Sequence, residues 1–216
     1  MKEKELERLK QLKDYEQKLY ASGLKYIAGI DEAGRGPLAG PVVVGIAIMK
    51  PDSMIEGIND SKKISETKRE KLYEKITEEA IDWSVGIVDQ REIDEINILN
   101  ATKKALTMAI SKLKVKPDRI MVDALEHIDT LGIPYTSVIK GDAKIYSISA
   151  ASILAKVTRD RILYELDKKY PEYDFKSHKG YPTKKHLELL EKYGVFDEYR
   201  KSYKPVKNLI DRGIIR

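Results

Sequence analysis

The stretch that decides the fold reads Ile27-Ala28-Gly29-Ile30-Asp31-Glu32-Ala33-Gly34-Arg35-Gly36-Pro37. Its apolar first half has the length and composition of a short buried strand. Two adjacent carboxylates, Asp31 and Glu32, follow this strand, and glycines that let a ligand approach the backbone flank Arg35. An arginine presents a planar fork that suits phosphate or sugar oxygens. This join can therefore hold a metal ion beside a phosphate group.

The rest of the chain predicts an alternation of strands and helices. Strands are expected at residues 25–30, 42–49, 83–88, 119–122 and 135–139, and helices at residues 2–20, 65–81, 93–113, 145–166 and 183–193. A loop is expected over residues 171–181. Because only a short turn joins the first two strands, they must pair antiparallel. The pattern indicates an α/β fold built on one sheet.

The composition limits the chemistry that the chain can perform. Its 216 residues, of which 42% are hydrophobic, are enough for one well-buried domain. With no cysteine, neither a disulfide framework nor a thiolate zinc site is possible, and three scattered histidines argue against a histidine-rich metal cage. No run reaches the roughly 18 apolar residues of a membrane-spanning helix. We therefore expect a cytoplasmic protein without a membrane partner, in which oxygen atoms hold any metal.

The basic excess lies in the last third of the chain. Residues 141–216 carry 17 Lys or Arg against 11 Asp or Glu, whereas the preceding residues carry 23 against 24. Eight of the thirteen tyrosines also fall there. Interleaved basic and aromatic side chains are typical of a nucleic-acid groove. The alternative interpretation is an ordinary solvated surface.

Carboxylates follow three of the predicted strands. Those side chains are Asp31, Glu32, Asp123 and Asp142. Ligands gather at strand ends in sheet proteins of this kind, and carboxylates brought together repel one another unless a hard divalent cation joins them. Mg²⁺ or Mn²⁺ fits best.

The geometry of a strand makes Glu32 the exception among these acids. Neighbouring strand residues point to opposite faces, so Glu32 can join Asp31 only past the strand end, at a bulge or through its carbonyl oxygen. An aspartate after a strand can also simply begin a turn or cap a helix, which is how we interpret Asp60 and Asp118.

Two phosphate-binding motifs do not fit the context. The glycines at positions 34, 36 and 40 resemble a dinucleotide fingerprint, but that motif must open a helix. Here Pro37 and Pro41 interrupt the stretch, and the residues that follow are strand-like. No Gly-Lys-Ser or Gly-Lys-Thr sequence follows either glycine cluster, which excludes a Walker-type loop.

Five motifs together resemble the bacterial ribonuclease HII family. They are Gly29-Ile30-Asp31-Glu32-Ala33-Gly34-Arg35-Gly36-Pro37, Asp60-Ser61-Lys62, Lys140-Gly141-Asp142, Ala150-Ala151-Ser152-Ile153-Leu154-Ala155-Lys156-Val157-Thr158-Arg159-Asp160 and His178-Lys179-Gly180-Tyr181-Pro182-Thr183. Their order and spacing match from about residue 25 to residue 206. The chain departs from the family at Tyr199-Arg200-Lys201-Ser202-Tyr203, where His-Arg-x-Ser-Phe is common, and at Ser149, where alanine is more usual.

The resemblance implies a ribonuclease H-like fold, a mixed five-stranded sheet flanked by helices. Residues 1–22 would form an accessory helix, and residues 23–216 the catalytic domain, with a helical C-terminal extension from about residue 170. Asp31, Glu32, Asp123 and Asp142 would be the acidic active-site residues and metal ligands. Gly34, Arg35 and Gly36 would contact the 2'-hydroxyl and phosphate of a ribonucleotide, and Tyr181 would stack on the deoxyribose that follows. Lys62 and Lys179 would be phosphate contacts or ordinary surface lysines.

The resemblance also implies a function, the cleavage of RNA that is paired with DNA or embedded in it. A monomeric, metal-dependent endoribonuclease would cut RNA in RNA/DNA hybrids, and would cut duplex DNA on the 5' side of an embedded ribonucleotide. It would leave 5'-phosphate and 3'-hydroxyl ends and serve ribonucleotide and primer removal. Three alternatives remain: the related ribonuclease HIII, a nucleic-acid-binding protein without catalysis, and a glycosidase that uses the adjacent carboxylates.

Overall fold

The computed structural model describes residues 2–216. Its strands are β1 (Ile27–Ala33), β2 (Val42–Ile48), β3 (Asp82–Val88), β4 (Arg119–Asp123) and β5 (Tyr135–Val138). Its α-helices are α1 (Glu3–Ala21), α2 (Glu66–Glu79), α3 (Gln90–Ser111), α4 (Tyr146–Lys169), α5 (Phe175–His178), α6 (Lys184–Tyr193) and α7 (Lys204–Asp211). Three 3₁₀ turns, η1 (Ser61–Lys63), η2 (Gly141–Ala143) and η3 (Pro171–Tyr173), complete the elements.

The five strands form one mixed sheet in the order β3-β2-β1-β4-β5. β1 pairs antiparallel with β2 and parallel with β4, and β4 pairs parallel with β5. The predicted mixed sheet and the antiparallel pairing of the first two strands are confirmed. Since β1 lies at the centre, the residues at its C-terminal end are surrounded by neighbouring elements.

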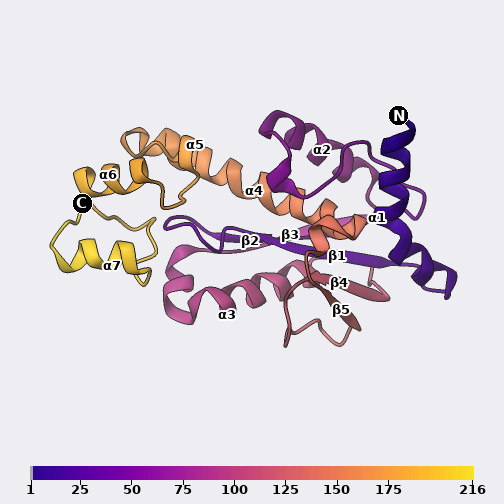
Figure 1. Ribbon diagram of the computed structural model, residues 1–216. Helices are drawn as coiled ribbons and strands as arrows, with labels where there is room; N and C mark the ends of the chain where they lie inside the picture. The colour runs from indigo at the N-terminus through magenta and orange to yellow at the C-terminus, as the bar shows by residue number, and fades with distance from the viewer. Residues whose placement is uncertain (1) are drawn as a thin grey trace.

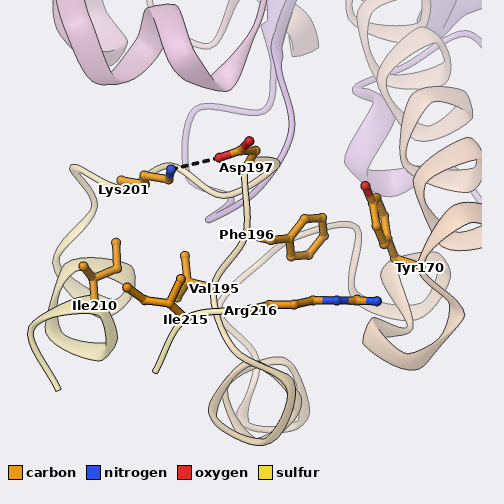
Figure 2. A pocket seen from close by; sticks show the side chains of 8 residues that line it. All are labelled: Tyr170, Val195, Phe196, Asp197, Lys201, Ile210, Ile215 and Arg216. Atoms are coloured by element: carbon orange, nitrogen blue, oxygen red, sulfur yellow. Dashed lines mark hydrogen bonds and ion pairs between the residues drawn. The ribbon is translucent and has the colours of Figure 1, made fainter. Parts of the chain in front are cut away.

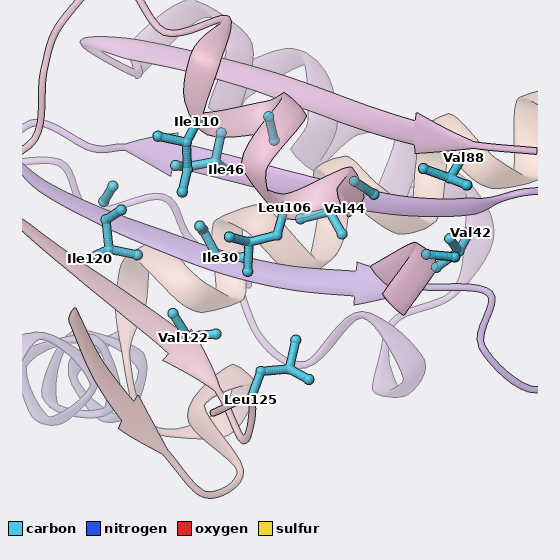
Figure 3. Close-up of a cluster of buried hydrophobic side chains, with 14 of the residues drawn as sticks. Ile30, Val42, Val44, Ile46, Val88, Leu106, Ile110, Ile120, Val122 and Leu125 are labelled. Atoms are coloured by element: carbon cyan, nitrogen blue, oxygen red, sulfur yellow. The ribbon is translucent and has the colours of Figure 1, made fainter. Parts of the chain in front are cut away.

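Helices cover both faces of the sheet (Figure 1). α3 packs on one face, where Ile30, Val44 and Leu106 belong to a buried apolar cluster (Figure 3). α4 lies on the other face, with α1 and α2 on the same side of the sheet (Figure 1).

α4 packs unusually close to the central strands. A Cβ added at Gly29 would lie 2.1 Å from the carbonyl carbon of Ser147, and one at Gly45 would lie 2.4 Å from the carbonyl oxygen of Ala151. The predicted central helix with small residues against the sheet is therefore confirmed. This contact fixes where α4 begins relative to β1.

α1 lies on the same side of the sheet as α4. Its Leu9 and Leu12 are buried, and so are two charged residues, Lys13 and Glu16. Among the helices that the structure describes, none combines the length and apolar character needed to cross a membrane.

The C-terminal region is helical, as the extension expected from about residue 170 implied, and it includes α7. The loop expected over residues 171–181 is wrong in part, because this segment contains η3 and α5. Residues 141–216 are all described, and of their eight tyrosines only Tyr181 is exposed; Tyr173 and Tyr199 are fully buried in an aromatic cluster. The interleaved tyrosines are therefore mostly core rather than groove, because this helical extension has no sheet and fills its centre with aromatic rings.

Candidate active site

Three of the four predicted acids meet at the C-terminal ends of the two central parallel strands. β1 supplies Asp31, β4 ends at Asp123, and η2 holds Asp142 just before α4. Each contributes one carboxylate oxygen to a group whose atoms all lie within 4.8 Å of one another. We call these three residues the acid cluster.

Backbone contacts hold the acid cluster in place. The Gly141 N–H donates to Asp123 Oδ1 at 2.7 Å, and the Ser149 hydroxyl donates to the carbonyl oxygen of Asp142 at 2.7 Å. Ser149, the residue at which the chain departs from the family pattern, thus supports the turn that carries Asp142. The turn is tied both to β4 and to the first part of α4.

The free acid cluster is electrostatically unfavourable. Burial, reinforced by the charge of Glu32, raises the pKa of Asp31 well above its usual value. Burial and the charge of Asp123 likewise raise the pKa of Asp142. Partial burial acts to lower the pKa of Lys62, but the carboxylates of Asp31 and Asp142 outweigh it, so the pKa of this lysine is raised. Lys62 is therefore a cation that faces the cluster.

Glu32 does not join the three-oxygen group. Its Oε1 lies 3.5 Å from Arg35 Nη1, with which it forms an ion pair. Burial raises the pKa of Glu32, while Arg35 lowers it and Asp123 raises it. Glu32 therefore borders the three-oxygen group rather than joining it, and β1 extends past it to Ala33. Both acids lie within the strand rather than after it.

The donor set of the acid cluster fits a hard divalent cation. Its members offer only carboxylate oxygens. These negative charges repel one another at such short distances, and a cation bound between them would reduce the repulsion. Of the two aspartates interpreted as turn or cap residues, Asp60 caps η1, whereas Asp118 instead joins the segment before β4 to the residues before β1. Asp60 accepts from the Lys62 N–H at 2.9 Å, and Asp118 accepts from the Lys25 and Tyr26 N–H groups at 2.8 and 2.9 Å.

Beside the acid cluster, the predicted substrate-binding residues 34–36 belong to a loop that two buried arginines hold from behind. We call residues 34–41 the glycine loop. Arg200 donates to the carbonyl oxygens of Gly34 at 2.6 Å, Arg35 at 3.0 Å and Gly40 at 2.8 Å. Arg159 donates to the carbonyl oxygens of Ala39 and Pro41, each at 3.0 Å. Both side chains are fully buried.

The outer surface of the glycine loop stays open. Arg35 is exposed, and a Cβ added at Gly36 would meet only Tyr181, at 3.8 Å. At Gly34, where φ is +98°, a Cβ would lie 2.2 Å from Arg159 Nε. The first glycine is thus required by packing beneath the loop, and the second leaves room above it.

Tyr181 is 40% exposed, and two stacked histidines hold its backbone. The rings of His178 and His186 lie 3.7 Å apart, centroid to centroid. Because the Gly180 N–H can only donate, His178 Nδ1 accepts from it, at 3.1 Å. His186 Nδ1 lies 2.8 Å from the Tyr181 carbonyl oxygen and donates to it. Burial lowers the pKa of both histidines, that of His186 to about 4, so both are neutral near pH 7.

A hollow of about 360 Å³ lies among the C-terminal helices, away from the acids. It is lined by Phe196, Ile210 and Arg216, among others, with Arg216 extended beside the aromatic rings (Figure 2). No member of the acid cluster lines it. Because none of the acids that could support hydrolysis reaches this hollow, we do not place the chemistry there.

Sequence reasoning missed the roles of Arg159 and Arg200. Both stood in quoted motifs, but nothing in the local pattern shows which carbonyls they would reach. One signal was available: Arg159 follows a run of small and apolar residues on a helix expected to be central, where a cation needs several acceptors.

The fold and the acid cluster place this protein among the ribonuclease H endonucleases. The structure is similar to the ribonuclease H2 of Pyrococcus horikoshii, with a TM-score of 0.74, 32% identity and coverage of 87% of this chain and 98% of that one. It is also similar to the structure of the complex of PCNA with ribonuclease HII from Archaeoglobus fulgidus, with a TM-score of 0.70, 30% identity and coverage of 83% and 96%.

The family model for ribonuclease HII matches residues 28–206. The ribonuclease HII of Clostridioides difficile is 56% identical over 207 residues, which is 96% of this chain and 80% of the relative. The chain belongs to the ribonuclease HII family. Membership removes the glycosidase, the non-catalytic binding protein and ribonuclease HIII as alternatives.

Proposed function

We propose that this ribonuclease H cleaves the RNA strand of RNA/DNA hybrids and also cuts duplex DNA on the 5' side of a single embedded ribonucleotide. The observation that carries the proposal is the position of the glycine loop, which follows β1 directly and so begins three residues after Asp31 of the acid cluster. A group that can sense a 2'-hydroxyl thus lies beside the groups that can support hydrolysis. The 2'-hydroxyl is what distinguishes RNA from DNA at a given position.

Each residue then has a role in binding or chemistry. Asp31 and Asp123 would hold Mg²⁺ or Mn²⁺, and Asp142 would position the second ion or the attacking water, with Glu32 as the fourth acid at the border of the site. When bound, these ions supply Lewis-acid stabilisation of the charge that develops on the phosphate and the leaving oxygen. The oxygen of a water molecule forms a bond to phosphorus while the bond between phosphorus and the 3'-oxygen breaks. The water loses a proton and the 3'-oxygen gains one, which leaves a 5'-phosphate and a 3'-hydroxyl.

The glycine loop and Tyr181 read the substrate. The backbone of Gly34 and Gly36 contacts the 2'-hydroxyl, and Arg35 contacts the adjacent phosphate. The exposed ring of Tyr181, in contact range of Gly36, packs on the next sugar, which lacks a 2'-hydroxyl. Together they recognise a junction from RNA to DNA. Lys62, which faces the acids, and Lys179 are candidate phosphate contacts.

The remaining expectations belong to the same proposal. The protein acts as a monomer in the cytoplasm, in ribonucleotide and primer removal. Residues 1–22 form an accessory element, and residues 23–216 form the catalytic domain with its helical extension from about residue 170. Binding weakens as salt rises, because the basic last third meets phosphates.

Three duplexes of one sequence test this function. One is all DNA, one carries a single ribonucleotide, and one has a complete RNA strand; each is incubated with Mg²⁺, with Mn²⁺ or with a chelator. We expect cleavage of the last two only, in the presence of metal, with the cut mapped to the 5' side of the ribonucleotide. A ligase that requires a 5'-phosphate and a 3'-hydroxyl should rejoin the nick after hybridisation. Cleavage confined to the complete RNA strand would contradict the proposal.

A further inference from the structure

We propose that Arg159 is a specificity-determining positioning residue, which joins the glycine loop and Tyr181 into one reading unit. The inference rests on the function proposed above and names a residue that does not itself touch the substrate. It predicts that ribose recognition by the loop and sugar stacking by Tyr181 depend on each other.

Arg159 reaches two segments with one guanidinium. Its Nε and Nη2 donate to the glycine loop, at Pro41 and Ala39, while its Nη1 donates to the carbonyl oxygen of Lys179 at 2.9 Å. Lys179 lies two residues before Tyr181. Because the guanidinium is planar and rigid, it fixes the distance between the loop and the segment that carries the tyrosine.

The two segments also touch each other around this side chain. The Leu38 N–H donates to the carbonyl oxygen of Gly180 at 2.7 Å. The guanidinium carbon of Arg159 lies 6.0 Å from the centre of the Tyr181 ring, and its Nε lies directly beneath Gly34. The Arg159 side chain therefore hydrogen-bonds to the glycine loop and to the segment just before Tyr181, whose ring it shares as a neighbour with Lys156, also 6.0 Å from the ring centre.

The charge of Arg159 has no direct counter-ion. Within residues 2–216, neither Arg159 nor Arg200 forms an ion pair, and the adjacent Asp160 is bound by Arg69 at 3.3 Å and Lys156 at 2.6 Å. Burial, and then the neighbouring Arg200, lower the pKa of Arg159 to about 10, so it stays protonated at neutral pH. Its positive charge thus lies under the surface where a phosphate would bind.

Arg200 provides an internal comparison. It is as deeply buried as Arg159 and also donates to glycine-loop carbonyl oxygens, but none of its recorded hydrogen bonds within the described residues goes to residues 178–181. Loss of the Arg200 guanidinium and its hydrogen bonds should disturb the glycine loop alone. Loss of the Arg159 guanidinium should also change the position of Tyr181 relative to the loop.

A double-mutant cycle tests this difference. Arg159→Lys keeps the charge but loses the fork, and Tyr181→Ala removes the ring. The quantity measured is the ratio of kcat/KM on the duplex with one ribonucleotide to kcat/KM on the complete hybrid. We expect Arg159→Lys to lower this ratio about tenfold, the equivalent of ~1.4 kcal/mol, and to lower it no further when Tyr181 is already alanine.

Two further variants serve as matched controls. Arg200→Lys should lower both rates and act independently of Tyr181→Ala. Arg8→Lys alters an arginine that also donates to a carbonyl oxygen, that of Ile58 at 2.7 Å, and should leave the ratio unchanged. If Arg159→Lys fails to fold, Gly180→Ala replaces it in the cycle, because its Cβ would lie 3.0 Å from the Ala39 carbonyl oxygen and push the two segments apart.

The possible results separate the two proposals. An unchanged ratio in Arg159→Lys, or effects of Arg159→Lys and Tyr181→Ala that simply multiply, would overturn the role of Arg159. If the wild-type enzyme fails to cut the duplex with one ribonucleotide, the proposed function itself is wrong. A ratio that falls only when Tyr181 is present supports the reading unit.

Discussion

The two ends of α4 lie beside buried charges of opposite sign. At its N-terminal end lie carboxylates whose pKa is raised because burial and like charges disfavour their ionised form, as for Asp31 and Asp142. In its second half lies Arg159, a buried cation that backbone carbonyl oxygens satisfy and that stays protonated. The acidic end has a donor set that fits a divalent cation, whereas carbonyl oxygens of the protein itself satisfy the Arg159 guanidinium. In the proposed function, the chemistry therefore lies where the fold leaves charge unsatisfied, and recognition lies on a hydrogen-bonded support.

The substitution with the strongest predicted effect removes one carboxylate of the acid cluster. Asp123→Asn keeps the acceptor for the Gly141 N–H but removes a ligand charge, so cleavage should fall by about 10³-fold or more. Thermal stability should stay equal or rise, because repulsion with Asp31 is relieved. Single-turnover cleavage and a melting curve measure the two effects, and duplex binding should be largely kept.

The matched control for this change is Asp118→Asn. Asp118 also accepts backbone N–H groups, from Lys25 and Tyr26, but lies before β4, away from the acid cluster. Its activity should remain close to wild type. If Asp123→Asn retains activity comparable to Asp118→Asn, the acid cluster is not the catalytic centre.

The next prediction distinguishes the roles of two glycines in the glycine loop, Gly34 and Gly36. Gly34→Ala places a Cβ against Arg159 at a φ of +98°, and should cost about 3 kcal/mol of folding free energy. Gly36→Ala meets only Tyr181, at an ordinary contact distance of 3.8 Å, so its stability should change by less than about 0.5 kcal/mol. Its cleavage at an embedded ribonucleotide should nonetheless fall about tenfold, or ~1.4 kcal/mol, because the methyl group narrows the approach to the backbone.

Denaturant unfolding and single-turnover cleavage of both glycine variants check this prediction. Equal stability of Gly34→Ala and Gly36→Ala would mean that Arg159 does not support the loop as the structure shows. Equal activity of Gly36→Ala and wild type would mean that substrate does not approach this glycine.

A pH effect tests the histidine stack beneath Tyr181. Burial lowers the pKa of His186 to about 4 in the folded state, whereas the unfolded chain titrates near 6.5. The stability from the neutral ring is therefore complete above pH 6.5 and is lost as pH falls toward 4, by roughly 3 kcal/mol at most. His186→Asn keeps a donor for the Tyr181 carbonyl oxygen but cannot titrate, so its unfolding free energy should fall less steeply over this range. Parallel pH profiles for the two proteins would disprove the assignment.

The smallest effect concerns Glu16, which α1 brings to the beginning of α4. Its Oε1 accepts from the Ser147 N–H at 3.1 Å, and burial raises its pKa to about 7. The folded state then binds the proton more tightly than the unfolded state, so stability is complete below pH 4.5 and falls as pH rises through 7. Glu16→Gln removes this loss and should stabilise the fold at pH 8, on the order of 2 kcal/mol, with little change at pH 5.

Denaturant unfolding of the Glu16→Gln variant at both pH values measures the difference. Glu7→Gln, a change at an exposed position of the same helix, is the control and should have no pH-dependent effect. A variant that is less stable than wild type at pH 8 would show that the ionised Glu16 stabilises α4 instead.

The local sequence pattern was sufficient to predict most of the strands and helices, but not all of them. The alternation and the apolar runs predicted the five strands to within a few residues, because a strand's periodicity is written in its own sequence. The same reasoning missed α7 and took residues 171–181 as a loop, since short helices there depend on packing around buried aromatic residues such as Tyr173 and Phe175. Short elements carry too few periods to be read locally.

The candidate site was also predictable only in part from the sequence. Carboxylates after strand-like runs indicated the acids, and Asp31, Asp123 and Asp142 do converge. Glu32 borders this group without joining it, and the extent of β1 was not predicted: its pairing with β2 carries the strand past Glu32 to Ala33. Their catalytic and metal-binding roles stay predictions that the variants above can test.

The order of strands and helices along the chain, the oxygen-only character of any metal site and the glycines that leave the backbone accessible could all be read from the residues. The groups that support that backbone could not, because they depend on how the chain folds. Arg200 reaches the carbonyl oxygen of Gly34 across 166 positions of the chain, and Glu16 reaches Ser147 across 131. Such pairs leave no periodic trace in the sequence, because a hydrogen bond to a main-chain carbonyl or N–H group requires no particular residue as its partner.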